Sequence, residues 1–339
     1  MVQTEKKIAI LHRYPKDQIR ETNASFPYIV REGVDVLTFK KFDRLHNAAK
    51  IIKSIAWIFY APLLVIFRGY DVIYCDDSFP FYPALVKLAS PGSKVVKRMG
   101  DFHLMYYVTG ILYHFFHFFE VIEWRMVDEI IAISKVMQDR IVSEIYTSEP
   151  VKKPKVWVAL DPVDPVNFPI YRKEDHGTVM FHGLLTRNKN VDVLLAAAER
   201  LPHILFTIVG DGPDRERLEN IAPHNVRFTG WVPFHKIVRI LNTCSVGVAL
   251  RSDNPGNDYV VTSPFLQYSI LEKPCLVTKR KVYGDYAWQF TGVEDLIHGI
   301  NALMANKSEG PKMREYVLKY HNAKDIGEQI WNLLLQFAS

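Results

Sequence analysis

Short runs rich in valine and isoleucine alternate along this chain with longer segments of helical period. Buried parallel strands joined by crossover helices give this pattern. Six strands are predicted in the first half, at residues 7–11, 34–39, 71–75, 94–98, 129–133 and 155–159. The pattern then restarts, with strands at residues 178–181, 205–209, 226–228, 246–250 and 274–278. We therefore predict two Rossmann-like α/β domains.

The length of the chain also favours two domains. A single hydrophobic core usually stops growing beyond about 250–300 residues, and this chain has 339. Residues 161–165 and 172–177 combine helix breakers with charged side chains, as an interdomain linker would. We expect domains at residues 1–172 and 173–322. In the second domain helices are expected at residues 190–200, 213–221, 234–242 and 264–271. A final helix within residues 323–339 is a candidate to cross back onto the first domain.

The net charge of +5 comes from 42 basic and 37 acidic residues spread over the whole length. This mild excess does not indicate a nucleic-acid partner, and it suits a diphosphate site or an anionic lipid surface equally well. Cys75, Cys244 and Cys275 are too few and too scattered for a disulfide framework or a zinc site. The N-terminus lacks the pattern of a signal peptide. We expect no metal and a cytoplasmic location.

A glycine turn follows the strand predicted at residues 178–181 and leads into a helix that begins near Asn190. Such a turn leaves backbone N–H groups at a helix N-terminus, where a phosphate can accept hydrogen bonds. Gly183 makes the turn, and Arg187 and Lys189 add positive charge. An ordinary βα loop with two surface cations explains the same residues, and both interpretations stay open.

Two further loops follow predicted strands. Gly210, Asp211 and Gly212 form a second glycine turn, where the missing side chains allow close backbone approach or a positive φ. Ser263 is a candidate N-cap with Pro264 in the first helical position, so the positive end of a helix would point toward the same edge. A tight turn and simple capping, without a ligand, are the alternatives.

In this order the segments resemble the family 4 retaining glycosyltransferases, and the resemblance covers most of residues 178–300. The matching pieces are Gly183 with Lys189, residues 209–213, residues 225–230, and Ser263-Pro264 with Lys273-Pro274. The first half matches more weakly, through residues 127–134 and 161–168.

The resemblance implies the GT-B fold, in which two Rossmann-like domains face each other across a cleft. It also implies sugar transfer from a nucleoside-diphosphate sugar, with retained configuration and with neither metal nor cofactor. The first domain would bind the acceptor, a sugar or a lipid-linked glycan, and the second the donor. The donor site so implied comprises Gly183, Arg187, Lys189, Gly210, Asp211, Gly212, Val232, Asp258, Tyr259, Ser263, Pro264, Phe265 and Gln267.

The sequence departs from the family pattern at several positions. Two glutamates of the family are replaced by Tyr259 and Gln267, although an amide can still hydrogen-bond ribose hydroxyls. The arginine after the first glycine is Leu184 here, which leaves Arg187 as its substitute.

The His-Asp pair of the family's first domain is also altered. Gly100-Asp101 stands in its place, with His103 two residues after Asp101. Asp101 and His103 are the candidates for the reacting centre, and a structural role for His103 is the alternative.

Residues 57–67 and 106–124 are unusually rich in aromatic side chains. Core packing explains such segments, and so does peripheral contact with a membrane. In the second case the acceptor is expected to be lipid-linked and the protein to sit at the inner face of the cell membrane.

Two other functions compete with transfer. A sugar-nucleotide-binding or scaffold protein of the same fold would explain the loss of both glutamates. A sugar-nucleotide epimerase shares the layout, but no acid/base cluster in the sequence favours it. A dehydrogenase is disfavoured, because no Gly-x-Gly-x-x-Gly follows the first strand.

Overall fold

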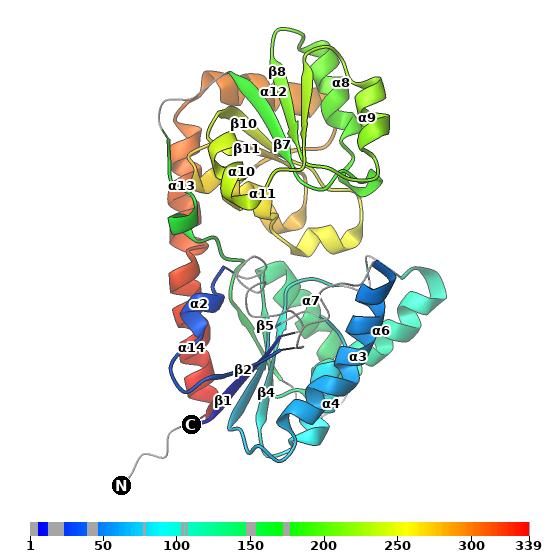
Figure 1. The fold of residues 1–339 in the computed structure, drawn as a ribbon, viewed down its shortest axis with the longest axis vertical. Coiled ribbons are helices and arrows are strands. Elements are labelled where there is room, and N and C mark those ends of the chain that lie inside the picture. Colours follow the sequence, from blue (N-terminus) through cyan, green and yellow to red (C-terminus); the bar gives the residue numbers. More distant parts are fainter. Residues whose placement is uncertain are drawn as a thin grey trace. The chain divides into compact units, whose positions relative to one another are not determined.

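A computed structural model of the protein describes residues 6–12, 24–38, 47–76, 79–102, 105, 108–146, 154–171 and 177–338. The chain divides into two compact units (Figure 1). The first unit comprises Met1–Pro162 and Ala323–Ser339, and the second comprises Val163–Asn322. Each contains one parallel six-stranded sheet, which confirms the two predicted Rossmann-like domains.

The first sheet has the strand order β2-β1-β3-β4-β5-β6. All six of its strands were expected from the sequence. They are β1 (Ile8–His12), β2 (Asp35–Thr38), β3 (Val72–Cys75), β4 (Lys94–Met99), β5 (Glu129–Ala132) and β6 (Lys155–Val158).

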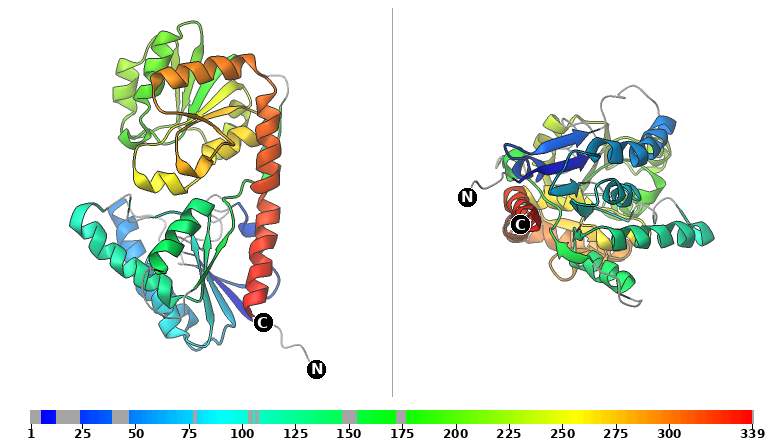
Figure 2. Two further views of the ribbon diagram at one scale, coloured as in Figure 1. Left: turned by 180° about the vertical axis from the view of Figure 1, so that it is seen from behind. Right: turned by 90° about the horizontal axis from the view of Figure 1, so that it is seen from below.

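Helices cover both faces of this sheet (Figure 2). On one face lie α3 (Asn47–Val65), α4 (Tyr82–Ala89), α6 (Gly110–Met126) and α7 (Lys135–Ile145). On the other lie α2 (Phe26–Ile29) and α14 (Ala323–Ala338). The C-terminal helix α14 belongs to the first unit, where its Ile330 and Leu334 are buried in one cluster with Ile8 and Ile10 of β1.

The division between the units falls earlier than the expected boundary at residues 172–173. Val163 forms a β-bridge with Asn322, and Phe168 is buried in a core cluster of the second unit. The side chain of Asn242 accepts a hydrogen bond from the backbone N–H of Tyr171 at 2.8 Å. These contacts attach residues 163–171 to the second unit, so the prolines at 162 and 165 mark the division better than the later charged run.

The second sheet has the order β12-β11-β10-β7-β8-β9. Its strands are β7 (Thr178–His182), β8 (Leu205–Val209), β9 (Val226–Gly230), β10 (Cys244–Ala249), β11 (Cys275–Thr278) and β12 (Trp288–Phe290). Only the short edge strand β12 was not predicted. The helices are α8 (Asp192–Arg200), α9 (Arg215–Ile221), α10 (Phe234–Leu241), α11 (Ser263–Ile270), α12 (Val293–Ala305) and α13 (Glu309–Tyr320), with 3-10 turns η1 (Pro165–Asn167), η2 (Arg187–Lys189), η3 (Pro255–Tyr259) and η4 (Lys281–Tyr283).

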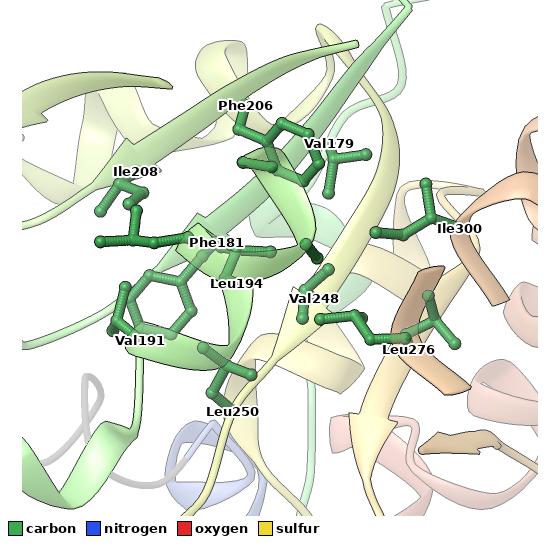
Figure 3. Packing of buried hydrophobic residues seen from close by; sticks show 14 of the residues in the cluster. Val179, Phe181, Val191, Leu194, Phe206, Ile208, Val248, Leu250, Leu276 and Ile300 are labelled. Atoms are coloured by element: carbon green, nitrogen blue, oxygen red, sulfur yellow. The ribbon is translucent and has the colours of Figure 1, made fainter. Parts of the chain in front are cut away.

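Two apolar clusters cover the two faces of the second sheet. The cluster drawn in Figure 3 packs Phe181 of β7 and Val248 of β10 with Leu194 of α8 and Ile300 of α12. The other cluster involves α10, α11 and α13. With both faces covered, the open edge at the carboxyl ends of the strands is the part of the sheet available for ligands.

Candidate functional site

A cavity of about 330 Å³ lies in the second unit, where the loops that follow β7 and β10 meet. These strands are neighbours in the sheet, so loops far apart in sequence converge there. The cavity is lined by Phe181, His182, Gly183, Lys189, Phe234, Ile237, Leu250, Arg251, Thr262, Ser263, Pro264 and Gln267. It therefore joins the first glycine turn to the Ser-Pro segment.

Two cations line the cavity without a counter-charge. Within the described residues, no carboxylate forms an ion pair with Lys189 or Arg251, and none lines the cavity. Burial, together with the positive field of Arg251, lowers the pKa of Lys189 to about 8. A depressed ammonium pKa indicates that the site lacks the negative charge that would stabilise this cation. The cavity is therefore suited to an anion.

His182 and Gln267 form a polar pair in the lining. His182 Nε2 lies 2.7 Å from Gln267 Oε1, and the imidazole packs edge-on against the ring of Tyr268. Burial lowers the pKa of His182 to about 4, against the opposing effect of the Gln267 hydrogen bond. The imidazole is thus neutral at physiological pH, and it contributes no charge to the cavity.

Helix α11 brings its N-terminus to the cavity. Thr262, and not the expected Ser263, is the N-cap, and its Oγ1 accepts a hydrogen bond from Phe265 N. Tyr283 fixes this cap, because its hydroxyl lies 3.0 Å from both Thr262 N and Thr262 Oγ1. Ser263 is consequently exposed at the first helical position, where the helix dipole favours negative charge.

The second glycine turn serves the packing of the two loops against each other. A Cβ on Gly210 would lie 1.9 Å from the carbonyl oxygen of Gly183, and one on Gly212 would lie 2.2 Å from that of Leu185. Both glycines also have positive φ, at +142° and +157°. Gly210 and Gly212 thus allow the loop after β8 to support the loop after β7, and neither lines the cavity.

Arg187 has a different environment from Lys189. Its Nε lies 3.2 Å from Asp214 Oδ1, and its side chain is 75% exposed. Asp211, likewise, pairs with Arg215 at 3.2 Å. The cationic pair at the cavity is therefore Lys189 with Arg251, and not Lys189 with Arg187 as the sequence suggested.

The other expected donor residues lie outside the cavity lining. Val232 packs against the apolar cluster of α10 and α11. Phe265 is fully buried against Tyr283 at a ring distance of 5.4 Å. Asp258 and Tyr259 are in the turn η3, and Asp258 lies 3.9 Å from Lys281 Nζ.

Of the two candidates for the reacting centre, His103 lies outside the described residues. Asp101 follows β4 in the first unit, in the electrostatic field of the buried Arg98. Arg98 itself pairs with Asp161 at 3.2 Å.

Sequence reasoning missed Arg251 and His182. Arg251 follows directly after the predicted strand at residues 246–250, and His182 directly precedes the predicted glycine turn. A search for polar residues immediately after each predicted strand would have found both, because ligands in α/β sheets bind at these ends.

Comparison with known proteins relates the second unit to a family and the chain to a fold. Residues 176–307 match the family described as glycosyl transferases group 1. No curated protein matches the chain.

Several solved structures share its fold. HepE from Anabaena, in a complex with UDP-glucose, is 14% identical with a TM-score of 0.70, covering 98% of this chain and 100% of that chain. Sucrose-phosphate synthase from Thermosynechococcus elongatus is 12% identical with a TM-score of 0.72, covering 98% and 99%. The lipopolysaccharide outer core galactosyltransferase WaaB is 12% identical with a TM-score of 0.66, covering 97% and 99%. These similarities identify the fold as GT-B, and residues 176–307 are similar to the group 1 glycosyltransferases.

Proposed function

We propose that this protein transfers a hexose from a nucleoside-diphosphate sugar to an acceptor hydroxyl, with retention and without a metal, and that Lys189 and Arg251 bind the diphosphate. The observation that carries the proposal is the pair of cations without a counter-charge in the cavity. A diphosphate would supply the missing negative charge. The complex of HepE with UDP-glucose makes uridine the first base to test.

In the reaction the acceptor oxygen bonds to the anomeric carbon of the donor. The bond from that carbon to the diphosphate oxygen breaks, and its electron pair stays on the diphosphate. The acceptor's proton leaves to a diphosphate oxygen or to water. Lys189, Arg251 and the N-terminus of α11 stabilise the charge that develops on the leaving group, which is the part of such a reaction where fixed electrostatics contribute most.

The first unit supplies the acceptor side in this proposal. Asp101 and His103 are its candidates for groups near the reacting carbon, because they follow the fourth strand of that unit. The acceptor is a sugar or a lipid-linked glycan.

A second candidate function is binding of the sugar nucleotide without turnover. It is favoured by the lining itself, since Gln267 faces a neutral imidazole and no described acidic residue lines the cavity. This alternative makes the same prediction for nucleotide binding and the opposite one for chemistry.

The donor site is tested by thermal shift with UDP, GDP, ADP, dTDP and CMP. One nucleotide should stabilise the wild-type protein, and Lys189→Ala and Arg251→Ala should each weaken its binding at least tenfold. Lys279→Ala is the matched control, because Lys279 is exposed on the same unit and does not line the cavity. Equal loss in all three variants would contradict a specific diphosphate site.

Turnover is tested separately, by release of the nucleotide from the donor sugar that binds. Slow hydrolysis without acceptor, lost in Arg251→Ala, supports transfer. Tight binding with no release, in the presence of a panel of sugar and lipid-linked acceptors, supports the binding protein.

A further inference from the structure

In the first unit, the described side chains of α3 and the first half of α6 leave large apolar groups exposed. Phe59 and Leu63 of α3 are 66% and 64% exposed, and Phe67 just beyond the helix is 97% exposed. On α6, Ile111, Phe115 and Phe118 are 85%, 57% and 62% exposed. We call these six residues the apolar face.

Ring contacts run from each helix to α4, which packs against both. Trp57 of α3 contacts Tyr82 at the start of α4, with ring centroids 5.8 Å apart. The preceding residue, Phe81, contacts Phe116 of α6 at 6.5 Å. Phe115 lies beside Phe116 at 5.5 Å. The two helices therefore belong to one aromatic assembly on the same face of the sheet (Figure 2).

The core does not need the apolar face. Trp57, Tyr82 and Trp124 are fully buried and fill the interior beneath these helices. A phenylalanine side chain presents roughly 150–250 Å², so the six exposed side chains amount to several hundred Å². Exposed apolar area on this scale is often functional in monomeric proteins.

Both carboxylates of α6 are buried. Glu123 is buried in a salt bridge with Lys97, and Glu120 is buried beside His117. No acidic residue occurs in residues 55–69 or 110–119, whereas Arg68 and His114 are exposed. The apolar face thus carries no carboxylate, and a cation directly follows Phe67.

Phe67 gives an independent indication. It adopts a φ of +61°, although this conformation is unusual for a bulky side chain. The cost of the left-handed backbone is about 1–2 kcal/mol, and the ring gains no burial in return. Strain of this kind is commonly associated with function.

We propose that the apolar face docks into the interface of an anionic lipid bilayer. A protein partner is disfavoured, because protein interfaces carry about one hydrogen bond per 100–200 Å² and the six side chains have no polar atom. Aromatic and aliphatic side chains flanked by cations are the composition of helices that lie in the membrane interface. Arg68 would then meet lipid phosphates while Phe67 enters the acyl region.

The test is co-sedimentation of the full chain with vesicles, without nucleotide. The wild-type protein should bind vesicles of phosphatidylcholine with phosphatidylglycerol, and more weakly those of phosphatidylcholine alone. A Phe115→Ser/Phe118→Ser variant should bind the anionic vesicles at least tenfold more weakly, and Arg68→Glu should lose the preference for them. Val166→Ser is the control, because Val166 is 80% exposed on the second unit and should leave binding unchanged.

Three results would overturn the proposal. These are failure of the wild-type protein to bind anionic vesicles, equal loss in the Val166 control, and a dimer in light scattering that the double variant abolishes. An unchanged circular dichroism spectrum shows that the fold of the variant's first unit is intact. The variant's thermal shift with nucleotide separates the two proposals, since loss of vesicle binding with retained nucleotide binding bears only on the membrane.

Discussion

His182 Nε2 lies 2.7 Å from Gln267 Oε1, and the other ring nitrogen of His182 is buried without a hydrogen-bond partner among the described residues. Burying an unpaired N–H is rarer and costlier than burying an unpaired lone pair. The hydrogen of the neutral imidazole therefore sits on Nε2 and is donated to Gln267 Oε1. This leaves the amide NH₂ of Gln267 as a donor toward a ligand.

We predict that His182→Phe weakens nucleotide binding about two- to tenfold, which corresponds to one hydrogen bond of about 0.5–1.5 kcal/mol. The phenyl ring keeps the contact with Tyr268 but cannot hold Gln267 in place. Isothermal titration measures the effect. An unchanged affinity in His182→Phe would argue against an orienting role.

We also predict that Gln267→Glu raises the pKa of His182 above its value of about 4, because a carboxylate favours the imidazolium. An NMR titration of the ring protons follows this shift.

The lowered pKa of Lys189, about 8, predicts an unusual pH dependence of nucleotide binding. Below pH 8 the ammonium is charged and affinity is full, and above pH 8 affinity should fall about tenfold per pH unit. Lys189→Arg should remove the decline, and Arg251→Ala should move its onset to higher pH. A flat affinity between pH 7 and 10 in the wild-type protein would mean that Lys189 does not contact the ligand.

The pKa of Lys189 has the opposite effect on the stability of the fold. In the unfolded chain the Lys189 ammonium keeps its proton up to the ordinary pKa of 10.5, whereas in the folded protein it loses the proton near pH 8. The unfolded state therefore binds more protons between these values, and the free energy of unfolding should rise with pH across this window. Denaturant titrations of the wild-type protein and of Lys189→Met, compared at both ends of the window, measure this contribution.

Arg187 should contribute little to binding, in contrast to the expectation from sequence. Its guanidinium pairs with Asp214 and is largely exposed. We expect Arg187→Ala to change nucleotide affinity less than twofold, while Arg251→Ala changes it at least tenfold. Exposed pairs of this kind are worth about 0–1 kcal/mol. A loss in Arg187→Ala as large as that in Arg251→Ala would restore the original assignment.

The contrast between Arg187 and Arg251 shows what could be predicted from sequence. Strand positions followed from local runs of valine and isoleucine, and all but β12 were found. β12 has only three residues, Trp-Gln-Phe, none of which is valine or isoleucine, so it carries too little pattern. Arg251 depends on the adjacency of β10 and β7, which is a property of strand order and not of any local segment. The ion pair of Arg187 likewise depends on where α9 begins.

Gly210 should tolerate no side chain. We expect Gly210→Ala to destabilise the second unit by about 2–4 kcal/mol, because the methyl group meets the backbone of Gly183 and not a movable side chain. Gly177→Ala is the matched control, since its φ of +65° is also positive but nothing lies within 4 Å of an added Cβ. Its cost should be about 1–2 kcal/mol. Equal costs in denaturant unfolding would show that the conformation matters and the contact does not.

The position of α14 has a consequence for dissecting the gene. Because the first unit contains both Met1–Pro162 and Ala323–Ser339, the polypeptide passes between the units twice. A stop codon after residue 322 would leave Ile8, Ile10 and Val72 without the helix that buries them, and such a fragment should aggregate. The second unit, in contrast, begins and ends at the paired residues Val163 and Asn322. It can be excised as one continuous insert, and a short Gly-Ser bridge from Pro162 to Ala323 would be the way to express the first unit alone.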